Sequence, residues 1–225
     1  MKKNSVNDAQ RANKIDIYPK NQKQKEYIEA LKNHNQVFAI GPAGAGKTYI
    51  PTIIATKAYL RGEIKKIILT RPAVEAGEEK HGFLPGNLDK KLAPWVLPVT
   101  EIIEEALGSK QRFMDMLSNG DLEVAPFTYM RGRTFKDAFV FLDEAQNTTP
   151  AQMEMFLTRL GENSKVVISG DLRQTDMLNG KSGLKMATDL VKKYDIPAAI
   201  IEFTSDDIVR SNLCQFWVKA FEKGL

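Results

Sequence analysis

Cysteine is nearly absent from this chain of 225 residues, in which Cys214 is the only one. No disulfide can therefore form within the chain, and no zinc site can be built from its cysteines. Long apolar runs are missing as well: no stretch approaches the roughly 18 apolar residues of a membrane span. The Lys/Asn-rich beginning also lacks the apolar centre of a signal peptide. These absences predict a cytoplasmic protein that does not enter a membrane.

Charge of one sign does not dominate the composition. The chain carries 32 Lys+Arg against 28 Asp+Glu, a net charge of +4, with a pI near 9.0. This mild basic balance is compatible with a nucleic-acid partner and also with an ordinary solvated surface. The hydrophobic share of 43% is enough for a full core. Length and composition together favour one sizeable α/β domain.

A glycine-rich stretch follows the pattern G-x-x-x-x-G-K-[ST]. It consists of Gly41, Pro42, Ala43, Gly44, Ala45, Gly46, Lys47 and Thr48. An apolar run at 37–40 suits a buried strand before it, and a helical pattern over 49–60 follows it. Glycines let successive N–H groups surround an anion, and the helix start adds positive charge. We predict a P-loop in which Lys47 reaches the β- and γ-phosphates of ATP and Thr48 binds Mg²⁺.

Two carboxylates directly follow a second apolar run, at 138–142. Asp143 and Glu144 would stand at the carboxyl end of a central parallel strand, where open sheets bind their ligands. Asp143 is predicted to hold Mg²⁺ through water. Glu144, expected to point the other way, is predicted to orient and deprotonate the attacking water. A further strand pattern over 165–169 runs into G-D-x-x-Q, whose Gln174 is expected to sense the γ-phosphate.

Other polar side chains are predicted around this site. Gln24, in a helix that opens at Asn21 upstream of the P-loop strand, resembles the adenine-reading glutamine of superfamily 1 helicases, whose amide can pair with a donor and an acceptor on the adenine edge. Gln22 is the alternative. Four arginines are candidates for nucleic-acid phosphates or for the nucleotide of an adjacent subunit: Arg71, Arg131, Arg133 and Arg173. The simpler interpretations are a solvent-facing glutamine and arginines paired with surface carboxylates.

The remaining segments predict how the chain is organised. Residues 1–17 are polar and aperiodic, and are expected to form a flexible arm. Residues 18–225 are predicted to form one domain, with 73–120 inserted over one end of the sheet because glycines and prolines interrupt any single helix there. Ser205 is expected to cap a last helix that packs into the core. The apolar face of that helix consists of Val209, Leu213, Phe216, Trp217 and Ala220.

The order of these motifs resembles the PhoH family of phosphate-starvation ATPases over roughly residues 24–190. The phrases R-P-A-V-E-A-G-E, G-F-L-P-G, Y-M-R-G-R-T and L-D-E-A-Q-N-T carry the resemblance. It implies a three-layer αβα, RecA-like P-loop domain with a mostly parallel sheet and a superfamily 1 helicase-like core. The stretch D-I-V-R-S resembles the family's D-V-V-R-H and makes Arg210 a helicase-like arginine, with Ser211 replacing the usual His. The length is similar to that of minimal, phage-type or compact bacterial members.

We therefore expect an enzyme that hydrolyses ATP with Mg²⁺ and couples this to RNA or single-stranded DNA. Helicases of this kind place ATP between two domains, but this chain has room for one. The resemblance then favours a homo-oligomer, with a hexameric ring first, in which one copy supplies an arginine to the next. Two alternatives are a nucleotide-dependent scaffold with little turnover and, less favoured, a small-molecule phosphotransferase. Glu144 beside Asp143 favours water as the acceptor.

Overall fold

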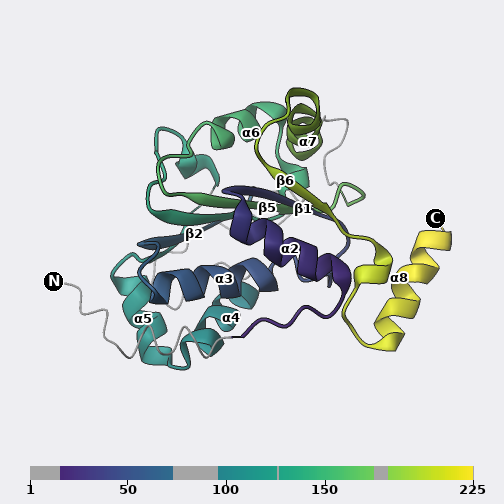
Figure 1. Cartoon of the computed structure of the whole chain (residues 1–225), viewed down its shortest axis with the longest axis horizontal. Coiled ribbons are helices and arrows are strands. Elements are labelled where there is room, and N and C mark those ends of the chain that lie inside the picture. The colour runs from purple at the N-terminus through teal and green to yellow at the C-terminus, as the bar shows by residue number, and fades with distance from the viewer. Residues whose placement is uncertain (1–15, 73–95, 126, 175–181, 225) are drawn as a thin grey trace, which may run out of the picture.

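The computed structural model describes residues 16–72, 96–125, 127–174 and 182–224. Its strands form a six-stranded sheet in the order β3-β2-β4-β5-β1-β6, in which all neighbours are parallel. The strands are β1 (Gln36–Ile40), β2 (Lys66–Thr70), β3 (Leu122–Val124), β4 (Ala138–Leu142), β5 (Lys165–Gly170) and β6 (Ala199–Glu202). With helices on both faces of this sheet (Figure 1), the predicted three-layer α/β class is confirmed.

Helices cover each face of the sheet as separate groups (Figure 1). One face carries α2 (Gln22–Asn33), α3 (Tyr49–Leu60), α4 (Leu97–Leu107) and α5 (Lys110–Ser118). The other carries α6 (Pro150–Leu157) and α7 (Gly183–Tyr194), and α8 (Asn212–Gly224) stands to one side. Short 3₁₀ turns are η3 (Phe127–Met130), η4 (Ala145–Asn147) and η5 (Ser205–Asp207). Among the described helices, none is both long and apolar enough to cross a membrane.

Strand alternation divides the core into two layers. On β1, Val37 and Ala39 join the layer beneath α2 and α3, whereas Phe38 joins the layer beneath α6 and α7. On β4, Phe139 and Val140 divide between the two layers in the same way. Because both faces of these strands are buried, their sequences are continuous apolar runs, as is typical of parallel sheets. Because all neighbouring strands are parallel, their carboxyl ends meet at one edge of the sheet.

The helix predicted upstream of the P-loop begins where expected. The Asn21 side chain accepts a hydrogen bond from the Gln24 backbone N–H at 2.8 Å, and α2 starts directly after Asn21, at Gln22. Such a cap contributes about 1 kcal/mol to the stability of a helix. The cap also fixes Gln24 in the first turn of α2, and this turn faces the P-loop.

The predicted insertion is described only in its second half, since 73–95 lie outside the described residues, as do residues 1–15 of the predicted arm. In the described half, α4 and α5 pack in the same core layer as α3, and they bury Val99, Ile103, Phe113 and Met116. Parallel neighbours such as β2 and β3 need a long crossover connection. Residues 96–118 belong to this connection and cover a face of the sheet, and Pro98, Val99 and Ile102 also line a cavity at its carboxyl edge.

The C-terminal helix differs from its prediction. Ser205 begins only the short turn η5, which closes when Asp207 accepts hydrogen bonds from the Thr204 N–H and hydroxyl at 2.8 and 3.0 Å. The backbone is extended at Ile208, and α8 begins at Asn212. The apolar side chains of α8 are exposed, among them Leu213, Phe216, Trp217 and Phe221. The prediction that this face packs into the core is therefore wrong.

One buried hydroxyl gives a stability prediction. Thr70 at the end of β2 is fully buried, and its Oγ1 has no hydrogen-bond partner in the described part of the chain. Since such a group costs about 1–3 kcal/mol, Thr70→Val should raise the unfolding midpoint by about 2–4 °C or more in calorimetry. Thr56→Val is the control, because the buried Thr56 Oγ1 donates to the Thr52 carbonyl at 2.8 Å. We expect this control to lower the midpoint; a lower midpoint for Thr70→Val would contradict the prediction.

Candidate nucleotide-binding site

A cavity of about 670 Å³ opens at the carboxyl edge of the sheet. The loops that follow four strands line it: the P-loop after β1, Arg71 after β2, Asp143 and Glu144 after β4, and Asp171 and Gln174 after β5. The β5 strand lies between β1 and β4, next to both. Motifs that are far apart in the sequence are therefore brought to one place by the strand order.

The P-loop has the backbone that its glycines allow. Gly41, Gly44 and Gly46 have φ values of +137°, +88° and +93°, which residues with a Cβ rarely adopt. Lys47 Nζ donates to the carbonyls of Gly41 and Pro42 at 2.5 and 2.7 Å. Burial lowers the pKa of Lys47, although the carboxylates of Asp171, Asp143 and Glu144 oppose this shift. The lysine thus lies against its own loop and faces the carboxylate side of the cavity.

Oxygen ligands suitable for Mg²⁺ lie in the same cavity. Thr48 precedes α3 and makes no capping hydrogen bond with its side chain, while Asp143 Oδ1 accepts a hydrogen bond from Ser169 Oγ at 3.2 Å. Mg²⁺ is usually bound by one or two protein oxygens together with substrate phosphates and water. The described residues contain no cluster of three or more His, Cys, Asp or Glu that could hold a metal by itself. Thr48 and Asp143 therefore fit a cation that arrives with a phosphate.

Glu144 has an unusual backbone conformation. Its φ of +51° and ψ of +39° lie in the left-handed region, which residues other than glycine seldom adopt. The turn ends the alternation of strand β4, so Glu144 lines the same cavity as Asp143 instead of facing the opposite layer. Such strain is concentrated at functional sites.

Both carboxylate oxygens of Glu144 have a polar partner. Arg71 Nη2 lies 3.5 Å from Oε1, and Gln146 Nε2 donates to Oε2. The side chains of Arg71 and Glu144 are 30% and 35% exposed, so their ion pair contributes only about 0.2–1 kcal/mol. The buried Gln146 also accepts a hydrogen bond from the Asp171 N–H at 3.1 Å, which links β4 to the loop after β5. Sequence analysis missed Gln146, whose only signal is its place two residues after Glu144.

The two candidate adenine-reading glutamines occupy different environments. Gln24 is buried against the P-loop, donates to the Ala45 carbonyl at 3.0 Å and accepts from the Lys20 N–H at 2.9 Å. It also lines the cavity, whereas Gln22 is exposed and hydrogen-bonds to Glu26. The structure thus brings Gln24 to the site, and its contact with adenine stays a prediction. Two tyrosines that were not predicted, Tyr18 and Tyr49, also line the cavity.

Two of the candidate arginines line the cavity, namely Arg71 and Arg210. Arg210 Nε lies 2.7 Å from the position that a Cβ on Gly44 would occupy, and the neighbouring Val209 N–H donates to the Gly44 carbonyl at 3.0 Å. The C-terminal segment therefore packs directly on the P-loop. The described lining does not include Gly41, Pro42, Ala45, Arg131, Arg133 or Arg173.

The arginines outside the cavity have other surroundings. Arg133 forms two hydrogen bonds with Glu123 of β3, at 2.5 and 2.9 Å, and these bonds lower the pKa of Glu123. Arg173 Nε lies 3.8 Å from Asp171 Oδ1, and Arg131 is exposed. Arg131 and Arg173 are both exposed and therefore accessible to a second molecule.

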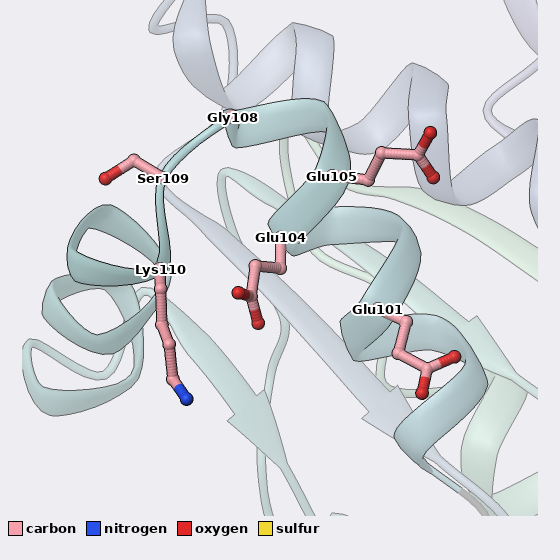
Figure 2. A pocket seen from close by; sticks show the side chains of 6 residues that line it. All are labelled: Glu101, Glu104, Glu105, Gly108, Ser109 and Lys110. Atoms are coloured by element: carbon pink, nitrogen blue, oxygen red, sulfur yellow. The ribbon is translucent and has the colours of Figure 1, made fainter.

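A second hollow lies beside the turn between α4 and α5. It is lined by Glu101, Glu104, Glu105, Gly108, Ser109 and Lys110 (Figure 2). The three carboxylates point in different directions in this view, so they do not form a common binding centre.

A P-loop and two carboxylates that line one cavity at the carboxyl edge of a parallel sheet define a P-loop NTPase. The chain belongs to the PhoH family, since the family model described as PhoH-like protein matches residues 16–222. It is 50% identical over 203 residues to the PhoH-like protein of Bacillus subtilis (strain 168), covering 89% of this chain and 62% of that protein. It is 44% identical over 209 residues to Protein PhoH of Escherichia coli (strain K12), covering 91% and 58%.

The chain thus spans about three fifths of the length of these curated relatives. Among solved structures, it is similar to Pif1 helicase from Candida albicans, with a TM-score of 0.44 and 15% sequence identity. That similarity covers 92% of this chain and 44% of the helicase chain.

Asp143→Asn is expected to stabilise the protein although it removes a predicted ligand of Mg²⁺. Burial and the charge of Glu144 raise the pKa of Asp143, so the folded protein binds this proton more tightly than the unfolded chain does. Ionisation of Asp143 therefore costs stability as the pH rises through the raised pKa. At pH 7 in EDTA and without nucleotide, urea unfolding should show a higher midpoint for the variant. The increase in midpoint should vanish below about pH 3.9, the ordinary pKa of Asp. A lower midpoint for the variant than for the wild type at pH 7 would contradict the prediction.

Proposed function

We propose that this protein hydrolyses ATP to ADP and phosphate in the presence of Mg²⁺. The observation that carries the proposal is the meeting of Lys47, Asp143 and Glu144 in one cavity. The P-loop N–H groups and Lys47 would bind the phosphates, and Thr48 and Asp143 would hold Mg²⁺. When bound, Mg²⁺ neutralises charge that develops on the phosphate oxygens.

Glu144 is the proposed general base. A water oxygen attacks the γ-phosphorus, the bond between this phosphorus and the β–γ bridging oxygen breaks, and ADP leaves. Glu144 accepts the proton that the water loses, a role that contributes about 10²–10⁴-fold to a rate. The Gln146 amide holds the Glu144 carboxylate in place. Gln174, exposed on the same cavity, is proposed to contact the γ-phosphate or its water.

Phosphate release by the purified protein tests this function. We expect release that requires ATP and Mg²⁺, that EDTA abolishes, and that Lys47→Ala abolishes. Lys185→Ala is the matched control, because Lys185 pairs with Asp189 on the surface of α7, away from the cavity. Release that Lys47→Ala leaves unchanged would come from another enzyme, and no release by the wild type would refute the function.

We further propose that RNA or single-stranded DNA stimulates this hydrolysis within a homo-oligomer, with a hexameric ring favoured. The support is the basic balance of the chain and an exposed Arg131 outside the cavity, which could reach a polymer or an adjacent subunit. Turnover per subunit should rise with protein concentration and with oligo-U or oligo-dT. Mass photometry should show assemblies under the same conditions. A monomer whose turnover responds to neither polymer would contradict this part of the proposal.

A nucleotide-dependent scaffold with little turnover is the alternative that one observation favours. The Arg71 guanidinium faces one oxygen of Glu144 at 3.5 Å, and the Gln146 amide donates to the other. An attacking water would have to compete with these two partners for the Glu144 oxygens. A wild-type protein that binds ATP tightly and leaves it intact would support the scaffold.

A further inference from the structure

Arg71 is brought to Glu144 by the pairing of two strands that are far apart in the sequence. In the register of β2 and β4, Thr70 is opposite Leu142, and the Asp143 N–H donates to the Thr70 carbonyl at 3.0 Å. Arg71 follows β2, and Asp143 and Glu144 follow β4. These residues therefore lie at the same edge of the sheet. This position is fixed by backbone hydrogen bonds and not by the ion pair itself.

The ion pair between Arg71 and Glu144 is long, so Arg71 can readily leave Glu144 for another acceptor. Its closest contact is 3.5 Å, whereas charge-assisted hydrogen bonds to guanidinium groups are about 2.7–2.9 Å long. Both side chains are part exposed and line the cavity. A stronger acceptor in the same cavity would therefore draw Arg71 away from Glu144.

The charges around the two carboxylates show where such an acceptor would lie. Lys47 interacts electrostatically with Asp143 and Glu144 from the P-loop, and Arg71 interacts with the same two residues from β2. Two cations thus flank the carboxylates at the end of the cavity that the P-loop lysine faces. A terminal phosphate bound by Lys47 would lie in the same cavity that the Arg71 side chain lines.

We propose that Arg71 is the residue by which this site distinguishes ATP from ADP: it exchanges Glu144 for the γ-phosphate when ATP binds. The proposal rests on the proposed ATP-binding function and deepens it. A phosphate accepts two parallel hydrogen bonds from the guanidinium fork, while Glu144 offers one distant oxygen. The exchange also frees Glu144 Oε1 to accept the proton of the attacking water. With ADP, Arg71 stays on Glu144, and because Arg71 acts within its own subunit, the effect needs no neighbouring copy.

Equilibrium binding of ADP and of the non-hydrolysable analogue AMP-PNP, each with Mg²⁺, tests the proposal by calorimetry. The wild type should bind AMP-PNP more tightly than ADP. Arg71→Ala should weaken AMP-PNP binding by about tenfold or more and leave ADP binding within about twofold. Arg71→Lys, which keeps the charge without the fork, should give an intermediate ratio. Arg61→Ala, at an exposed cation 3.7 Å from Glu63 and outside the cavity, is the matched control and should keep the wild-type ratio.

Glu144→Gln supplies a second, independent readout. It removes the charge that competes for Arg71, so AMP-PNP should bind more tightly and ADP binding should change little. The double variant with Arg71→Ala should then match Arg71→Ala alone, because the competition no longer exists. Additive effects of the two substitutions would overturn the exchange.

The remaining outcomes separate this inference from the proposed function. A wild type that binds neither nucleotide refutes both. A wild type that prefers AMP-PNP, with the preference unchanged in a folded Arg71→Ala or Arg71→Lys, refutes the exchange alone. Equal loss of ADP and AMP-PNP binding also refutes it. Loss of oligo-U or oligo-dT binding without a change in the nucleotide ratio would instead assign Arg71 to the polymer.

Discussion

Glu144→Gln is expected to lower the rate of ATP hydrolysis by about 10²–10⁴-fold while ATP binding persists. The amide keeps the size of the side chain and its place beside Gln146, but it cannot accept the proton of the attacking water. The left-handed backbone at this residue is retained, since glutamine has the same backbone requirements as glutamate. Phosphate release and nucleotide affinity, measured on the same preparation, separate loss of chemistry from loss of binding.

The control for this substitution is Glu105→Gln, at an exposed carboxylate of α4 outside the P-loop cavity. It should hydrolyse ATP at the wild-type rate. Hydrolysis within about tenfold of the wild type in Glu144→Gln would rule out general-base catalysis by this residue. A variant that no longer binds ATP would instead assign Glu144 to binding.

Gly41→Ala is expected to cause the largest loss of stability. Gly41 has a φ of +137°, and a Cβ at this position would lie 2.4 Å from the carbonyl oxygen of Phe203. The Phe203 oxygen belongs to the backbone and cannot turn aside as a side chain could, and the hydrogen bond from the Phe203 N–H to the Ile40 carbonyl, 2.7 Å long, holds that backbone in place. The backbone strain and the overpacking together should cost about 3 kcal/mol or more. Calorimetry should therefore show an unfolding midpoint lower by about 6 °C or more.

Gly120→Ala isolates the conformational part of that cost. Gly120 also has a positive φ, +71°, but a Cβ there meets nothing within 4 Å. The substitution should cost only the left-handed penalty, about 1–2 kcal/mol. Equal midpoints for the two variants would mean that the C-terminal segment does not press on the P-loop as the structure shows.

Local sequence signals were sufficient for the elements that build the site. The P-loop, its strand and its helix were predicted because glycine spacing and buried apolar runs are local properties. The predicted helix over 49–60 matches α3, Tyr49–Leu60. The position of Asp143 after β4 followed from an apolar run that ends in a carboxylate.

The relations between elements could not be predicted in the same way. Arg71 meets Glu144 because β2 lies next to β4, and the strand order of a sheet is not a local property. Gln146 bridges two loops because the chain makes a left-handed turn at Glu144, and no residue type in the sequence predicts this turn. On α8, the apolar periodicity correctly indicated a helix, but periodicity does not specify what covers the apolar face, and Phe216 is exposed.

Single-turnover hydrolysis tests the central claim most directly. Excess wild-type protein is mixed with a trace of γ-labelled ATP and Mg²⁺, with and without a single-stranded oligonucleotide. We predict that the bound ATP is converted to ADP and free phosphate, faster when the oligonucleotide is present, and that Glu144→Gln holds the ATP intact. Recovery of intact ATP from the wild type under both conditions would contradict ATP hydrolysis and favour the nucleotide-dependent scaffold.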